Sequence, residues 1–241
     1  MSVYNGAKDL PIAIESIINQ SHKNIVMFIV DDGSYDGTRD ILFNYSAKYS
    51  NIKCFYNDHN LGLPSCLNQA LKEVDSEYIA RMDADDYSYP DRIQKQLEYM
   101  LENPHIDVLG TCANFSDSNG NQIFVKKPEN FDEIIRTIEF KNPFIHSSVM
   151  MRRTFIENLG GYDNKLKKAQ DLDLWLRGVS INNYSNLPDV LLKYSCRKQN
   201  ITLLLYGFRV RATNAWRRKR IFPGLIKAII IFIYGFFKSI R

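Results

Sequence analysis

Three carboxylates stand within four positions of the chain, at Asp83, Asp85 and Asp86, directly after the short apolar run 78–80. Like charges this close together raise the cost of ionising one another, so their concentration needs a physical reason. Two carboxylates at i and i+2 in a loop offer the hard oxygen ligands that Mg²⁺ or Mn²⁺ takes while it keeps water or phosphate at its other positions. An ordinary solvated turn is the alternative.

Two other acidic segments invite the same question. Asp31 and Asp32 close an apolar run and precede Gly33-Ser34, where a turn or helix cap needs one side-chain acceptor and leaves the other acid to meet a ligand N–H or hydroxyl. Asp171 stands at the start of a predicted helix, whose positive end keeps a carboxylate ionised. An ordinary acid in the first helical turn is the alternative reading there.

The spacing of apolar residues predicts the elements that position these acids. Helices and strands alternate through the first two-thirds of the chain, which favours an α/β fold with a mostly parallel sheet flanked by helices. We predict helices over 7–20, 36–49, 63–74, 90–103, 132–140, 153–159 and 171–180, and strands over 25–30, 52–56, 77–82, 106–110 and 147–151. Both acidic clusters follow predicted strands, and parallel sheets bind ligands outside the carboxyl ends of their strands.

Charge divides the chain unevenly. The net charge is +4, yet the first 189 residues carry 19 basic and 27 acidic side chains, a net −8, and the last 52 carry +12 with no acid. We therefore predict a catalytic domain over 1–200 and a basic, apolar and helical tail over 201–241. Such a tail suits an anionic partner, and anionic lipid or nucleic acid is the candidate.

The apolar run from Ile221 to Phe237 favours lipid over nucleic acid. It is interrupted by Pro223, Gly224 and Lys227 and falls short of the roughly 20 residues of a spanning helix. An amphipathic helix on an anionic membrane surface is the preferred interpretation, with a docked core helix and a true span as alternatives. Widely spaced cysteines without a CxxC pair, and no recognisable signal peptide, predict a cytoplasmic protein bound peripherally to the inner face of the cell membrane.

An ordered set of segments resembles one enzyme family, the family 2 glycosyltransferases, from residue 2 to about 195. These are inverting enzymes with a Rossmann-like GT-A fold that use nucleotide-sugar donors. The segments that carry the resemblance are Val3-Tyr4-Asn5-Gly6, Asp31-Asp32-Gly33-Ser34, Asn60-Leu61-Gly62, Met82-Asp83-Ala84-Asp85-Asp86, Pro90-Asp91-Arg92, His146-Ser147-Ser148, Gly160-Gly161-Tyr162-Asp163 and Gln170-Asp171-Leu172-Asp173-Leu174-Trp175-Leu176-Arg177.

The resemblance implies a role for each matched position. Tyr4 would stack on the nucleotide base, and Asp32 would accept an N–H from it. Asp83 would lie near the ribose. Together with Asp83, the metal ligands would be Asp85 and Asp86, holding Mn²⁺ or Mg²⁺. A sugar hydroxyl is a poor nucleophile near neutral pH, so a general base must take its proton, and the resemblance assigns that role to Asp171.

The implied activity is transfer of a sugar, with a UDP-sugar as the first choice of donor, to a glycan or lipid-linked acceptor. The alternatives are a nucleotidyltransferase of similar fold and a truncated, non-catalytic relative. His146 and Trp175 each suit either a packing role or a substrate contact.

Three departures from the family pattern are visible. The family has a β-strand before its Val-Tyr-Asn segment, whereas this chain begins at Met1, so we expect a sheet that lacks the first strand. Gln170 replaces a Glu beside the expected base. Arg197 stands near the position of a family His, where it cannot bind a metal but could contact the donor diphosphate.

Overall fold

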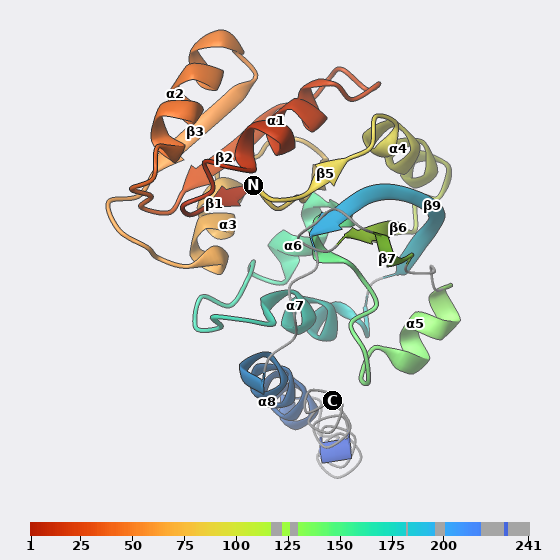
Figure 1. Ribbon diagram of the computed structural model, residues 1–241. Helices are drawn as coiled ribbons and strands as arrows, with labels where there is room; N and C mark the ends of the chain where they lie inside the picture. The colour runs from red at the N-terminus through yellow and green to blue at the C-terminus, as the bar shows by residue number, and fades with distance from the viewer. Residues whose placement is uncertain (117–121, 126–129, 182, 196–200, 218–228, 231–241) are drawn as a thin grey trace.

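The protein is an α/β molecule built on two β-sheets with helices packed around them (Figure 1). A computed structural model describes residues 1–116, 122–125, 130–181, 183–195, 201–217 and 229–230. The strands are β1 (Ser2–Val3), β2 (Met27–Asp31), β3 (Ile52–Tyr56), β4 (Tyr78–Ala80), β5 (Tyr87–Ser88), β6 (Val108–Ser116), β7 (Gln122–Val125), β8 (Met150–Arg152) and β9 (Tyr184–Ser195). The predicted α/β class is confirmed.

The helices follow the predicted pattern closely in the first half of the chain. They are α1 (Leu10–Ile18), α2 (Thr38–Lys48), α3 (Leu63–Leu71), α4 (Arg92–Glu102), α5 (Phe131–Thr137), α6 (Arg153–Asn158), α7 (Gln170–Gly178) and α8 (Ile201–Arg217), with a 3₁₀ turn at His146–Ser148. In α1 the residues at helical spacing, Leu10, Ala13 and Ile14, are fully buried. The amphipathic period therefore selects the face that packs on the sheet.

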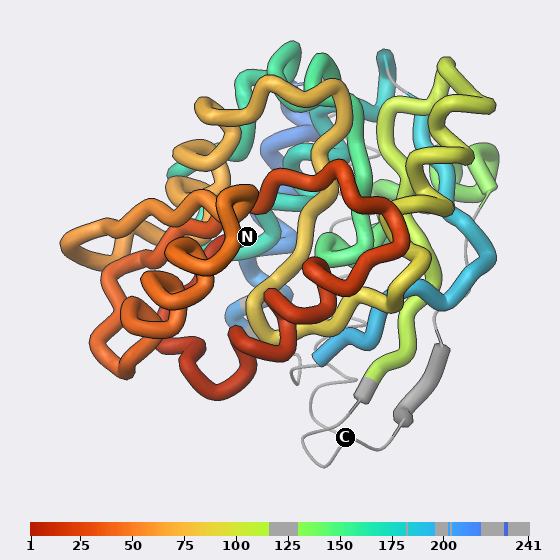
Figure 2. The backbone as a smooth tube through the Cα atoms, turned by 90° about the horizontal axis from the view of Figure 1, so that it is seen from above, coloured from red at the N-terminus to blue at the C-terminus, as the bar shows by residue number. Residues whose placement is uncertain are grey.

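The first sheet is parallel, with strand order β1-β2-β3. Its central strand is apolar on both faces, as expected for a parallel sheet covered by helices. Ile29 packs in one cluster with Leu10 of α1 and Leu42 of α2. Figure 2 shows the N-terminal third of the chain, red to orange, gathered at one side of the molecule. The carboxyl end of β2 carries Asp31 and leads directly to Asp32.

The second sheet is mixed, with order β4-β8-β6-β9-β5 and β7 paired to β6. Strands β6 and β9 run parallel, while β4 and β8, β6 and β8, and β5 and β9 are antiparallel. Parallel pairing is therefore less extensive than the sequence pattern suggested. We did not predict β9, which contains Pro188. A register shift relative to β6 accommodates this proline, because Thr111 pairs with Leu187 and the next residue pairs with Val190.

The expected lack of a full first strand agrees with the structure, which has only a short strand at this position. Strand β1 is two residues long and lies parallel to β2, with Ser2 opposite Val30. The Asp32 amide donates to Val3 O at 2.8 Å, which continues the ladder to the carboxyl end of β2. Beside this short strand, a cavity of about 500 Å³ lies between the two sheets, lined on opposite sides by Phe28 and Ile79.

The predicted tail begins as helix α8, which packs against α7 at the end of the molecule remote from α1 and α2 (Figure 1). Arg211 donates to the carbonyl oxygens of Glu139 and Phe140, at 2.8 and 3.1 Å. Most of the apolar run 221–237 lies outside the described residues. Among the helices that the model describes, none combines the length and the apolar character needed to cross a bilayer.

An aromatic cluster fills the centre of the C-terminal half. Trp175 is fully buried and lies 5.1 Å from Phe144 and 6.1 Å from Phe155, measured between ring centroids. Tyr184 closes the cluster and donates its hydroxyl to Trp175 O at 2.9 Å. Of the two roles left open for Trp175, the structure supports packing in the core.

Replacing the two tryptophans separately tests this assignment. Trp175→Ala is expected to lower the free energy of unfolding by about 3–5 kcal/mol, because it leaves a large cavity in a packed core. Trp216→Ala is the matched control, because 69% of Trp216 is exposed and a change there should stay within about 0.5 kcal/mol. Urea denaturation followed by circular dichroism measures both, and equal losses would contradict the assignment.

Candidate functional site

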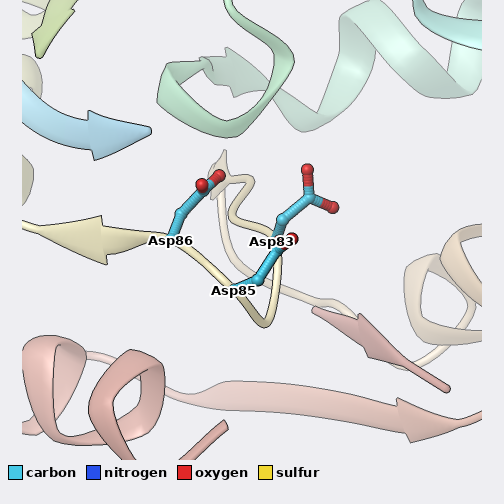
Figure 3. A group of neighbouring side chains, drawn as sticks. All are labelled: Asp83, Asp85 and Asp86. Carbon is cyan, nitrogen blue, oxygen red and sulfur yellow. The ribbon is translucent and has the colours of Figure 1, made fainter. Parts of the chain in front are cut away.

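Asp83, Asp85 and Asp86 lie together on the loop between β4 and β5. Each offers a carboxylate oxygen within 4.8 Å of the others. Figure 3 shows Asp83 and Asp86 projecting to the same side of this loop. The strand ends after Ala80, so the loop is free to turn all three toward one region. The structure therefore brings the predicted metal ligands together.

A buried arginine, Arg81, lies beside the carboxylates and was given no role in the sequence analysis. Its Nη1 donates to Asp83 Oδ2 at 2.7 Å, and its Nη2 donates to Asp83 Oδ1. Arg92, also buried, donates to the Arg81 carbonyl oxygen at 2.8 Å. A two-pronged pair of this kind fixes the direction of a carboxylate as well as compensating its charge. Arg81 thereby orients Asp83.

Asp86 is the most deeply buried of the three acids. Its Oδ1 accepts the Ser195 amide at 2.8 Å. Its Oδ2 is buried and has no hydrogen-bond partner within the described part of the chain. Burial, and then the negative charge of Asp83, raise the pKa of Asp86 to about 7. A cation among these oxygens would satisfy the orphaned atom and stabilise the ionised form, so hard carboxylates fit Mg²⁺ or Mn²⁺ here.

Asp31 and Asp32 at the end of β2 are both engaged by the protein. Asp31 pairs with Arg39 at 2.8 Å. Asp32 is buried and accepts the amides of Leu61 and Gly62 at 2.8 and 2.9 Å, and it also accepts an amide N–H from Asn57. Through these three hydrogen bonds Asp32 holds the 57–62 loop against the end of β2.

Tyr4 lies at the surface beside the same strand end, with 47% of it exposed. Its ring meets Tyr35 edge-on, with 6.2 Å between centroids. The neighbouring backbone is fixed by Asn5, whose amide donates to Ser34 Oγ and whose side chain accepts the Tyr35 amide. The loop with Asp83 is adjacent, because Ala84 packs on the cluster that contains Val3.

Asp171 lies in the first turn of α7, as predicted, and is partly buried. Its Oδ2 accepts the amide group of Asn142 at 2.5 Å. Burial raises the pKa of Asp171 above its usual value, and hydrogen bonds from the Leu172 amide and from Asn142 offset part of that rise. A carboxylate with a raised pKa is a stronger base than an exposed one.

Packing contacts bring the loop of the carboxylate cluster and helix α7 together, because Ser147 Oγ accepts the Asp83 amide at 2.7 Å and the ring of the preceding residue, His146, lies 6.0 Å from that of Trp175 on α7. Burial and then the charges of Asp83, Asp86 and Asp171 raise the pKa of Tyr194. Tyr194 lies on β9, the strand that the sequence analysis missed. Asp171 is therefore electrostatically close to the carboxylate cluster, although the two come from segments about 90 residues apart in the chain.

His146 and Tyr162 lie beside the carboxylate cluster, because Ser147, which follows His146, accepts the Asp83 amide at 2.7 Å, and we call this pair the wall of the site. The His146 Nε2 atom and the Tyr162 hydroxyl lie 2.9 Å apart. Burial, and then the positive charge of Arg81, lower the pKa of His146 well below its usual value, so its ring is neutral at neutral pH. Arg197, assigned to the donor diphosphate, lies outside the described residues.

The fold and the site define a glycosyltransferase of the GT-A class, in which a carboxylate cluster follows an α/β sheet. A family model described as Glycosyl transferase family 2 matches residues 1–160. The chain belongs to this family. Among its relatives are the uncharacterized glycosyltransferase MJ1057 of Methanocaldococcus jannaschii, 33% identical over 98% of this chain and 84% of that protein, and the amylovoran biosynthesis glycosyltransferase AmsE of Erwinia amylovora, 31% identical over 80% and 73%.

Two solved structures share the fold. TarS of S. aureus, residues 1–349 in complex with UDP, superposes with a TM-score of 0.67 and 20% identity, covering 88% of this chain and 64% of that one. Mannosyltransferase PcManGT of Pyrobaculum calidifontis, in complex with GDP-Man and Mn²⁺, has a TM-score of 0.67 and 18% identity, covering 95% and 72%. This chain spans just under two-thirds of the TarS chain.

Substituting Asp86 tests the cost of its buried charge. A raised pKa means that ionisation opposes folding, and the penalty is absent below about pH 4 and complete above about pH 7. Asp86→Asn is therefore expected to raise the melting temperature of the metal-free protein at pH 8 by about 2–6 °C, and to change it little at pH 4.

Thermal denaturation in EDTA at pH 4, 6 and 8 measures this effect. Asp58→Asn, at an exposed position after β3, is the control and should show no such trend. A lower melting temperature for Asp86→Asn at pH 8 would show that the ionised carboxylate stabilises the metal-free fold.

Proposed function

We propose that this glycosyltransferase moves a sugar from a nucleotide diphosphate donor to a glycan or lipid-linked acceptor, with inversion at the anomeric carbon. The observation that carries the proposal is the meeting of the Asp83 loop with helix α7 at residues 146–147, where Ser147 Oγ accepts the Asp83 amide at 2.7 Å and the His146 ring lies 6.0 Å from that of Trp175. A direct displacement needs a set of metal ligands and, in the same site, a separate and more basic carboxylate. The metal-binding acids serve the leaving group, and the separate acid serves the nucleophile.

The donor side is assigned from the residues at the ends of β1, β2 and β4. Tyr4 stacks on the base, Asp32 accepts an N–H from it, and Asp83 faces the ribose. Support comes from the UDP in TarS and the GDP-Man in PcManGT, and a UDP-sugar is the first choice. Arg197 is assigned to the diphosphate on its sequence position alone.

The cation is assigned to Asp85 and Asp86, with Asp83 beside them. The Mn²⁺ in PcManGT supports Mn²⁺ or Mg²⁺ as the choice for this chain. When bound, the ion supplies positive charge that stabilises the departing diphosphate. The buried Asp86 Oδ2 atom has no hydrogen-bond partner among the described residues, and such an ion would give it one.

Asp171 is the general base. It accepts the proton from the acceptor hydroxyl as the new glycosidic bond forms, and Asn142 holds the carboxylate in the direction needed. Neutral His146 and Tyr162 bound the site without adding a competing charge. One displacement inverts the anomeric carbon. The name of AmsE supports a role in polysaccharide biosynthesis, so we assign the acceptor to a growing glycan.

The tail is assigned to the anionic inner face of the cell membrane, which makes the enzyme cytoplasmic and peripheral, with domains over 1–200 and 201–241. Helix α8 supports this by exposing Leu205 and Trp216 together with Arg209. Tryptophan and arginine are residue types that suit the boundary between lipid and water.

Asp171→Asn tests the base. Transfer from UDP-sugars is expected to fall by about 10²–10⁴-fold, because the amide cannot accept the proton. Binding of UDP with Mn²⁺, measured by calorimetry, should stay within about twofold, since Asp171 does not hold the donor.

Asp132→Asn, another acid in the first turn of a helix, is the matched control and should retain full activity. Unchanged transfer in Asp171→Asn would refute the base assignment. Release of pyrophosphate from UTP and a sugar 1-phosphate, with no transfer from UDP-sugars, would indicate a nucleotidyltransferase, and failure of the wild-type chain to bind UDP would indicate a non-catalytic relative.

Deletion of residues 218–241 tests the membrane assignment. The full chain is expected to sediment with vesicles that contain phosphatidylglycerol and much less with phosphatidylcholine vesicles, because each Lys or Arg near an anionic surface contributes about 1 kcal/mol. The shortened chain, which retains α8, should lose most of this binding. Equal sedimentation of both chains would contradict the assignment.

A further inference from the structure

Arg177 makes three hydrogen bonds, one within its own helix and two to the loop after α6. It lies in the last turn of α7, and its Nε donates to Asp173 Oδ2 at 2.7 Å. Its Nη1 and Nη2 donate to the carbonyl oxygens of Leu159 and Gly161, at 2.6 and 2.7 Å. Only the planar, forked guanidinium reaches all three at once, because a lysine ammonium has a single nitrogen.

The loop that Arg177 holds leads to the wall of the site. Gly160 and Gly161 both have positive φ, 71° and 78°, which turns the chain sharply after α6. The next residue, Tyr162, places its hydroxyl against His146. Its backbone amide and carbonyl are both bonded to the Asn68 side chain, at 2.9 and 2.8 Å. The position of the wall therefore depends on how this loop is fastened.

The helix to which Arg177 belongs also carries the proposed base. Asp173 is two residues after Asp171 and is buried, and its amide donates to Ala169 O at 3.1 Å. Ala169 has a φ of 59°, which is unfavourable for a residue with a side chain and needs support from its surroundings. Asp173 Oδ1 accepts the Asn214 amide group at 3.1 Å, which ties α7 to α8.

We propose that Arg177 is a positioning residue for glycosyl transfer, setting the placement of the Tyr162–His146 wall relative to Asp171. The inference rests on the proposed role of Asp171 as base. Arg177 joins the loop and the helix through Asp173, and it touches neither the metal ligands nor the assigned base. Small errors in the placement of reacting groups cost large factors in rate. The hydrogen bonds of Arg177 therefore control kcat more than they control donor binding.

Arg177→Lys separates positioning from simple stabilisation. The lysine keeps a positive charge beside buried Asp173 but cannot hold both loop carbonyls, so the fold should survive while the loop loosens. We expect kcat for transfer to fall about tenfold or more. Affinity for UDP with Mn²⁺ should stay within about twofold, because the donor site is untouched.

The matched control is Arg153→Lys. Arg153 also combines an ion pair, with Glu157 at 2.8 Å, and a carbonyl contact, with Ser76 O at 3.0 Å, but neither partner belongs to α7 or to the 159–161 loop. It should keep full turnover. Added guanidinium at tens of millimolar should restore part of kcat to Arg177→Ala and nothing to Arg153→Ala.

Two results would overturn the proposal. One is a full kcat in Arg177→Lys, and the other is a loss of kcat that disappears when assays are run well below the melting temperature of the variant. Failure of the base assignment is recognised separately, as unchanged transfer in Asp171→Asn, whatever Arg177→Lys does.

Discussion

Mutual repulsion among the carboxylates after β4 is the constraint on which the rest of the site depends. Asp83, Asp85 and Asp86 are close enough that each disfavours ionisation of the next. The protein compensates one of them with buried Arg81 and leaves an oxygen of Asp86 without a partner among the described residues. Charge that the fold does not neutralise itself is available for a ligand, and it is kept at a cost in stability.

The neighbours of each acid suit it to a different chemical task. Arg81 faces the carboxylates and also contributes to the low pKa of His146, which keeps that ring neutral. Asp171 stands on helix α7, whereas the cluster lies on a loop, and its hydrogen-bond partner is Asn142. Burial raises its pKa and so makes it more basic. Two acidic groups with different neighbours can thus serve as metal ligand and as base within one site.

The parts of this arrangement that depend on local pattern were predictable from the sequence. Strand β3 falls on the predicted residues, Ile52–Tyr56, and α1 to α4 lie within the predicted ranges. The spacing suggested the carboxylate cluster, with an ordinary turn as the alternative, and the resemblance to the family favoured the cluster. Its partners did not, because Ser195 lies 109 residues from Asp86 in the chain, and no local pattern specifies such a contact.

Other misses have equally physical causes. Strand β9 was missed because Pro188 and Asp189, residue types that are rare in strands, stand in its middle, and only the shifted pairing with β6 makes them compatible with a strand. Asp32 illustrates a different limit. The sequence suggested Asp32 as an acceptor for a ligand, and no local pattern showed that the 57–62 loop also donates two backbone amides to it. Which groups a loop will satisfy is decided by tertiary structure.

The bond between Asp173 and Asn214 has a consequence for how the protein is made. The two residues are 41 positions apart, and Arg217, which also faces Asp173 at 3.5 Å, is 44 positions away. During synthesis the N-terminal sheet can form first, since its three strands and the helices that cover it lie within the first 71 residues. Helix α7 has to wait for α8 to leave the ribosome before its buried Asp173 is fully paired. The newborn chain can therefore order the end of β2 before it orders the helix that carries Asp171.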